Sequence, residues 1–418
     1  DRDFTPEEVA GMTQLTEEQK ARLNASPALY YGSKDVYKDL FGNNGPQTQL
    51  NLNISGGTDR VKYFSSFGFF NQESITNAVK YYDADTKSSF RRYNFRSNFD
   101  IDVVKNLTIS LNLAGQFGTM QGPSTSSDPY DLDGRYFTMM QLVMEGNPIQ
   151  TVGVMDGRLI STYAGERGSP QNPLSMIIAD KKGGLNTMYH FLRSGAGYIY
   201  NNLLDNTLKL EYRMPYLTEG LRVTGTVNYQ DNYNKYVGIT PSIPEYTVQR
   251  NLEDPNIIEF FGGSMGNDGF ESYGYSNWNK LYVDAGINYE NSFDKHNILA
   301  LVLGKASKYT MPGDNNHTPS GIMGLVGRMA YNYADRYMAE FNMGYNGTEQ
   351  FAKGSRFSLF PAFSAGWVPT LEPFFPKNDI LSFLKIRGSY GEVGNDLLGS
   401  TGRRYLYLPN TYNLNEGG

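Results

Sequence analysis

The chain of 418 residues has no cysteine and only 3 histidines. The missing cysteines exclude disulfides, thiol nucleophiles and thiolate metal sites, and so few histidines argue against a histidine-rich metal site. No run of about 18 apolar residues occurs, which excludes membrane-spanning helices. The net charge of −6 provides no positive excess for a polyanion, so we expect no nucleic-acid partner.

The N-terminal segment also lacks a leader sequence, because no basic start and apolar core follow Asp1. We therefore expect that a leader has been removed or that the chain begins inside a longer protein. Helix-start signals at Thr5 and Thr16 predict a short helical and loop segment over 1–46. The run of Gly, Asn and Pro at 42–46 ends it.

The rest of the chain, 47–418, shows alternating polarity. Segment 107–117 reads LTISLNLAGQF, which gives a strand one apolar and one polar face. The pattern recurs about a dozen times, in long segments that often end in aromatic residues. The predicted strands are 47–55, 60–71, 91–103, 106–117, 203–214, 221–236, 280–293, 296–309, 322–334, 336–346, 357–370 and 382–393.

The connections between these strands alternate between tight turns and long loops. Tight turns are expected at 56–59, 104–105, 294–295 and 334–335, and long loops at 72–90, 118–202, 237–279, 310–321 and 347–356. Outer-membrane barrels have short periplasmic turns and long extracellular loops. The 32 tyrosines suit the boundaries between membrane and water. The sequence therefore predicts an all-β, antiparallel transmembrane β-barrel.

Four motifs in order resemble one family. Segment 55–64 reads SGGTDRVKYF, segment 92–98 reads RYNFRSN, segment 172–174 reads NPL and segment 389–396 reads SYGEVGND. Together they resemble the central barrel of the SusC/RagA class of TonB-dependent outer-membrane transporters. Such barrels have about 22 strands and a plug in the lumen. The chain thus matches about twelve of these strands, with no plug domain.

The resemblance implies import of large nutrients across the outer membrane of a Gram-negative bacterium. Glycan oligosaccharides are the first expectation for the cargo and oligopeptides the second. The implied partners are a SusD-like surface lipoprotein, the TonB–ExbB–ExbD complex acting through the plug, outer-membrane lipid, and a second copy in a dimer of transporter–lipoprotein pairs.

Ligand contacts are predicted at aromatic and acidic residues of the long loops. The candidates are Tyr130, Asp131, Tyr136 and Trp278, because exposed rings stack on sugars or peptide side chains and carboxylates accept hydrogen bonds. No cofactor is expected. Asp128, Asp131 and Asp133 leave a Ca²⁺ site open as the lesser alternative to an acidic turn.

Arg92 and Arg96 share one strand face with Asn94 and Asn98. We predict a lumenal polar row there, paired with carboxylates of a plug or of a neighbouring strand. No catalytic arrangement emerges from the histidines or carboxylates, so the chain is not expected to be an enzyme. The alternative function is that of a secreted, soluble β-rich carbohydrate-binding protein, and a glycan-degrading enzyme is a third.

Overall fold

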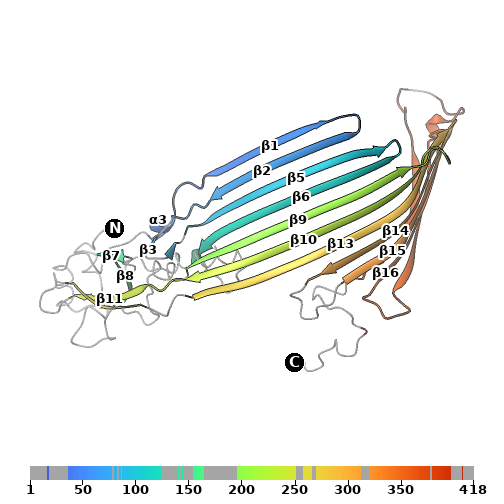
Figure 1. Ribbon diagram of the computed structural model, residues 1–418. Helices are drawn as coiled ribbons and strands as arrows, with labels where there is room; N and C mark the ends of the chain where they lie inside the picture. The colour runs from blue at the N-terminus through green and yellow to red at the C-terminus, as the bar shows by residue number, and fades with distance from the viewer. Residues whose placement is uncertain are drawn as a thin grey trace.

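A computed structural model describes residues 36–77, 80–81, 84–85, 87–123, 154–163, 195–250, 258–265, 270–311, 320–376 and 379–396, and the single residues 17, 140, 141, 144 and 407. Most of them form one antiparallel sheet of 12 strands, drawn in Figure 1 as a curved wall. Each strand pairs with the long strands that precede and follow it in the chain. The strands are β1 (Gln47–Gly57), β2 (Val61–Glu73), β5 (Ser89–Val104), β6 (Leu107–Pro123), β9 (Ala196–Arg213), β10 (Leu221–Thr240), β13 (Phe270–Phe293), β14 (His296–Thr310), β15 (Ser320–Tyr333), β16 (Tyr337–Thr348), β17 (Phe357–Trp367) and β18 (Ile386–Gly391).

The wall has one face of apolar side chains, because the pairing register keeps the alternation in phase between strands. Leu111 of β6 lies opposite Leu208 of β9, which lies opposite Val227 of β10 and then Val283 of β13. The residues between them in the chain occupy the other face and are mostly polar. The polarity thus predicts an outward face toward lipid and an inward face toward the lumen.

The outward face is exposed although it is apolar. Leu52 is 58% exposed, Ile287 is 54% exposed and Val302 is 54% exposed. A wall one layer thick has no other side against which to bury these side chains, so lipid is the solvent that suits them. An exposed apolar face of this kind is what the predicted transmembrane barrel requires.

Aromatic side chains mark two levels on the outward face. Tyr63, Tyr212, Tyr289 and Tyr337 lie near the tight turns. Near the opposite ends of the strands, two stacked pairs, Phe95–Phe117 and Tyr345–Phe357, have ring centroids 6.1 and 5.3 Å apart. Aromatic rows of this kind border the lipid-facing band of outer-membrane barrels.

The tight turns lie together at one end of the wall (Figure 1). Asp294, Ala334 and Asp335 adopt φ values of 50°, 51° and 58°, which lets the two β-hairpins reverse direction within a few residues. The short connections assign this end to the periplasm and the other end to the cell exterior. The connection from β17 to β18 is an exception, because it runs over 368–385 and holds the short 3₁₀ helix η1 (Pro369–Leu371).

The strands reach further outward than the alternation predicts. β6 continues to Pro123, β9 begins at Ala196, and β13 begins at Phe270 rather than near residue 280. The alternation weakens at these ends because the side chains there no longer meet lipid. The region predicted as loop also holds a second sheet, in which β11 (Pro244–Arg250) pairs with β12 (Ile258–Met265) and with β8 (Arg158–Tyr163), which pairs with β7 (Val154–Met155).

The segment before the sheet contains helix α3 (Val36–Leu40). Leu40 is fully buried, and Phe41 forms a β-bridge with Thr76 beside the outer end of β2. The strands β3 (Lys80–Tyr81) and β4 (Ala84–Asp85) pair in the loop that follows β2. The helix starts predicted at Thr5 and Thr16 lie outside the described residues. Among the described residues, no helix has the length and apolar character needed to cross a membrane.

Candidate functional site

Trp278 lies on the inward face of the wall. It belongs to β13, opposite Asn232 of β10, and its ring is 5.7 Å from that of Tyr309 on β14. Tyr273 and Tyr275, from the same predicted loop, occupy alternate positions on the outward face and are 55% and 60% exposed. Strand periodicity therefore separates Trp278, which faces the lumen, from two tyrosines that do not.

The other predicted ligand residues, Tyr130, Asp131 and Tyr136, lie outside the described residues. The same holds for Asp128 and Asp133, so the calcium alternative stays a prediction. Within the part of the chain that the structure describes, no cluster of three or more acidic or histidine side chains is arranged to hold a metal ion.

The arginine row on β5 faces the lumen as the spacing predicts. Arg92 lies opposite Phe70, and its guanidinium carbon stands 5.6 Å from the centre of that ring. Among the described residues, no carboxylate pairs with Arg92 or Arg96, and Arg92 Nε is buried without a hydrogen-bond partner. Within the described residues, the predicted pairing of Arg92 and Arg96 with carboxylates of a neighbouring strand is therefore not found. The ring of Phe70 covers Arg92 instead.

Charged groups gather on the inward face near the periplasmic turns. Arg328 on β15 donates to Glu340 on β16 at 3.0 Å, and Arg222 on β10 lies 3.4 Å from Glu290 on β13. Further along, Ser110 donates to Asp100 across the β5–β6 pair. Exposed pairs of this kind add little stability, about 0–1 kcal/mol each. Their consequence is a lumenal surface that presents both charge signs at one level.

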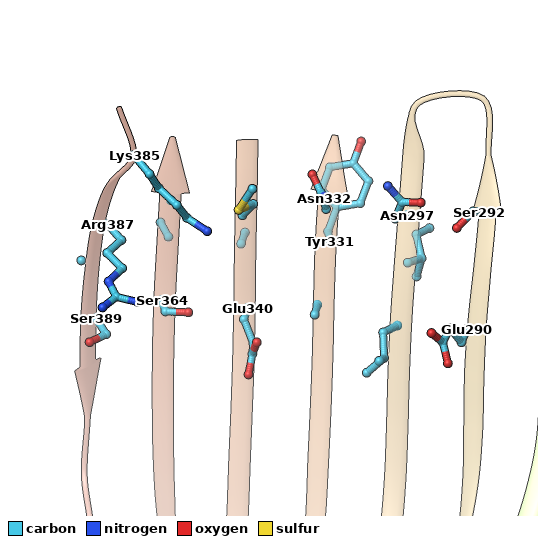
Figure 2. Close-up of a pocket in the computed structure, with 18 of the residues that line it drawn as sticks. Glu290, Ser292, Asn297, Tyr331, Asn332, Glu340, Ser364, Lys385, Arg387 and Ser389 are labelled. Atoms are coloured by element: carbon cyan, nitrogen blue, oxygen red, sulfur yellow. The ribbon is translucent and has the colours of Figure 1, made fainter. Parts of the chain in front are cut away.

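A hollow of about 780 Å³ opens at this level between β13 and β18. Figure 2 shows Lys385 and Arg387 at one side of it and Glu290 on the strand farthest from them, with Glu340 between. Its remaining labelled polar lining is Ser292, Asn297, Tyr331, Asn332, Ser364 and Ser389. We name it the lower hollow. Its mixed charges suit a polar protein surface better than an apolar ligand.

A second hollow, of about 540 Å³, lies on the inward face near the cell exterior. Phe360 and Phe351 give it two aromatic walls, and Lys305, Asn346 and Asp396 supply a cation, an amide and a carboxylate. Asn346 Oδ1 is buried and has no hydrogen-bond partner among the described residues. We name this the upper hollow, and its rings and polar groups are those that bind sugars or peptides.

Sequence reasoning did not predict the upper hollow, because its residues come from four separated segments. The motif SYGEVGND supplies one wall, and a Cβ added at Gly394 would stand 2.4 Å from the ring of Phe360. Only a residue without a side chain allows this contact, which explains physically why glycine occurs there. The register places Phe360 and Asn346 on one face of the sheet, and no local pattern in the sequence indicates that they lie close together.

Comparison with known proteins finds chains that are similar in sequence and in fold. No family model matches the chain. A TonB-dependent receptor of Formosa agariphila is 20% identical over 408 residues, which cover 96% of this chain and 35% of the relative. The TonB-dependent receptor SusC of Bacteroides thetaiotaomicron is 21% identical over 409 residues, 89% of this chain and 36% of the relative. The chain thus spans about a third of the curated relatives.

Solved structures agree on the fold. The RagAB peptide importer in its open-open state aligns with a TM-score of 0.60 and 14% sequence identity, over 96% of this chain and 43% of that chain. The comparisons confirm the resemblance to SusC/RagA-class transporters, the β-barrel fold and the location in the Gram-negative outer membrane.

Proposed function

We propose that the chain forms a wall and part of the outer vestibule of a TonB-dependent importer of large nutrients. The observation that carries the proposal is the division of one wall into two surfaces. The outward face is apolar between aromatic rows, and the inward face holds charges, Trp278 and the upper hollow. A polar lumen in an apolar shell is a path for polar cargo through lipid.

The cargo proposed first is a glycan oligosaccharide, as expected from the resemblance to the SusC class. The upper hollow supports it, because Phe360 offers a ring face while Asn346 and Asp396 offer hydrogen bonds. An oligopeptide is the second candidate, favoured by the alignment with a peptide importer. In that case Lys305 and Asp396 would pair with peptide charges.

The proposed partners follow from the same family. A SusD-like lipoprotein would deliver cargo to the outer end of the wall, and the TonB–ExbB–ExbD complex would act on a plug. The lower hollow is the surface we assign to plug contact, because it lies near the periplasmic end of the wall. Its lining includes Lys385 and Arg387, and neither has an ion pair among the described residues. We propose a dimer of transporter–lipoprotein pairs and no catalytic step.

The test is uptake by cells that carry the full-length transporter and its lipoprotein. Labelled oligosaccharides and oligopeptides are supplied with and without TonB, and Phe360→Ala is compared with Phe363→Ala, which alters an outward side chain of the same strand. We expect uptake to stop without TonB. Loss of one stacking contact, about 1 kcal/mol, should weaken apparent affinity roughly fivefold for Phe360→Ala alone.

Three results would contradict the proposal. Uptake that continues without TonB would contradict active import, and equal effects at Phe360 and Phe363 would contradict the upper hollow as a cargo contact. Cargo recovered in cleaved form from purified protein would contradict the absence of catalysis.

A further inference from the structure

The outward face of the wall has a hollow of its own near its outer margin. This groove, of about 340 Å³, crosses β13 to β17. The small side chain of Ala306 leaves space between larger neighbours. The ring of Phe357 lies over Gly347, where a Cβ would stand 2.4 Å from it, and forms one wall of that space. We name it the outer-face groove, and its apolar lining is Leu281, Val283, Ala306, Met323 and Phe357.

The height of the groove places it at the outer boundary of the membrane. Lys308 lies about twelve residues along β14 from His296, where the strand leaves its periplasmic turn. At about 3.3 Å per residue and a tilt near 40°, this separation is roughly 30 Å of height. Phe357, which lines the groove, stacks on Tyr345 of the upper aromatic row. Lipid head groups lie at this level.

Two cations border the groove in a chain whose net charge is negative. Among the described residues, Lys308 has no ion pair. Arg356 uses its Nε to donate to the carbonyl of Phe351 at 3.1 Å, which leaves other guanidinium N–H groups available. The nearest carboxylate in the lining, Glu349, accepts from the backbone N–H of Gly321 at 2.8 Å.

We propose that the outer-face groove binds one phosphorylated, multiply acylated glycolipid of the outer leaflet. An acyl chain would occupy the space above Ala306, beside the ring of Phe357, and a sugar phosphate would bind Lys308 and Arg356. Cations beside an apolar surface at the depth of the head groups favour an anionic lipid. The cations attract its charged head group, and the apolar surface contacts its acyl chains. Ala306 and Lys308 lie on the outward face, whereas Arg356 also lines the upper hollow. Lipid retention in the absence of cargo is therefore the measurement that tests this groove separately from the proposed cargo site.

The experiment measures lipid retained by the purified full-length transporter. Protein stripped of lipid is incubated with lipid A, dephosphorylated lipid A or phosphatidylglycerol, and bound copies are counted by native mass spectrometry. The variants are Lys308→Gln with Arg356→Gln, which removes the charges, and Ala306→Leu, which fills the groove. Their matched controls are Lys295→Gln in the periplasmic turn and Ala300→Leu, lower on the same strand and face.

We expect the unaltered protein and both controls to retain one lipid A. The charge variant and Ala306→Leu should each reduce retention about tenfold, and dephosphorylated lipid A should bind as poorly. Retention of lipid A by the charge variant at the unaltered level would overturn the proposal. Equal binding of dephosphorylated lipid A or of phosphatidylglycerol to the unaltered protein would overturn it as well.

Discussion

Leu111 and Ser110 are adjacent in the chain and lie on opposite faces of the wall. Leu111 lies opposite Leu208 in the outward row, whereas Ser110 donates to Asp100 on the inward face. The environment of each side chain therefore depends on which of the two strand faces it occupies. A side chain reaches lipid or lumen according to whether its number in the strand is odd or even.

We predict that Leu111→Arg destabilises the barrel much more than Ser110→Arg. A cation on the lipid face near the middle of the bilayer costs about 2–4 kcal/mol, whereas at Ser110 it would remain in a polar surface. The measurement is urea unfolding of full-length protein in lipid vesicles. Equal destabilisation by the two substitutions would show that the faces are assigned wrongly.

Several residue-level expectations could be derived from the sequence. The alternation placed Arg92 and Arg96 on the lumenal face, and the register confirms that placement. It could not show that Phe70 would cover Arg92, because that contact depends on which strand lies beside β5. The upper hollow was missed for the same reason, since Phe360 and Gly394 meet only after the sheet has formed.

The carboxylate of Glu372, in the connection that follows β17, links the periplasmic ends of β16 and β17. Glu372 follows η1, is buried, and accepts from Trp367 Nε1 at 3.2 Å and from Arg336 at 3.3 Å. A hydrogen bond from Tyr337, then that from Trp367 and the charge of Arg336, hold the pKa of Glu372 below its usual 4.5, although burial opposes them. The ionised form therefore connects the start of β16 to the end of β17.

We predict that Glu372→Gln lowers stability at neutral pH and that this difference disappears in acid. Because the pKa of Glu372 is lowered on folding, its ionised carboxylate stabilises the folded protein at pH values above the ordinary pKa of 4.5. This stabilisation is lost as the pH falls through the pKa of the folded state. Urea unfolding of both proteins between about pH 7 and about pH 3 measures the difference.

The matched control is Glu219→Gln in the β9–β10 turn, where the carboxylate has no ion pair among the described residues. Its unfolding should follow that of the unaltered protein at every pH. A difference between Glu372→Gln and the unaltered protein that stayed constant with pH would contradict the ionised role of Glu372.

The elements themselves were largely predictable, and their ends were not. All twelve long strands were predicted, because lipid on one side and a polar lumen on the other impose the alternation. β13 nevertheless begins about ten residues earlier than predicted, where both faces meet water and the pattern fades. The parallel pairing of β8 with β11 joins two distant loops, which no local pattern could indicate.

The whole molecule extends well beyond the membrane. Tyr275 lies about 18 residues along β13 from Phe293, which corresponds to roughly 45 Å above the periplasmic end, whereas Ile287 lies at roughly 15 Å. The apolar band of an outer-membrane barrel is about 25 Å tall. The outer half of β13 therefore surrounds the vestibule and not the bilayer.

We predict that a cysteine at Tyr275 reacts with a membrane-impermeant maleimide on intact cells and that one at Ile287 does not. The absence of cysteine from this chain permits single-site labelling in a full-length protein free of other cysteines. Both side chains point outward, so they differ only in height. Labelling at Ile287 on intact cells as fast as at Tyr275 would refute the membrane position.

The order of the sheet, in which each long strand pairs with its neighbours in the chain, also bears on how the wall assembles. Four of the eleven pairings close over only two or three residues, at 58–60, 105–106, 294–295 and 334–336, so these hairpins can form at small entropic cost. The junction of β6 with β9 must close over 124–195, which costs about 1–2 kcal/mol more than closing 74–88. Assembly should therefore be slow at this junction. The strands β1, β2, β5 and β6 would already be paired with one another before the strands from β9 onward pair with β6.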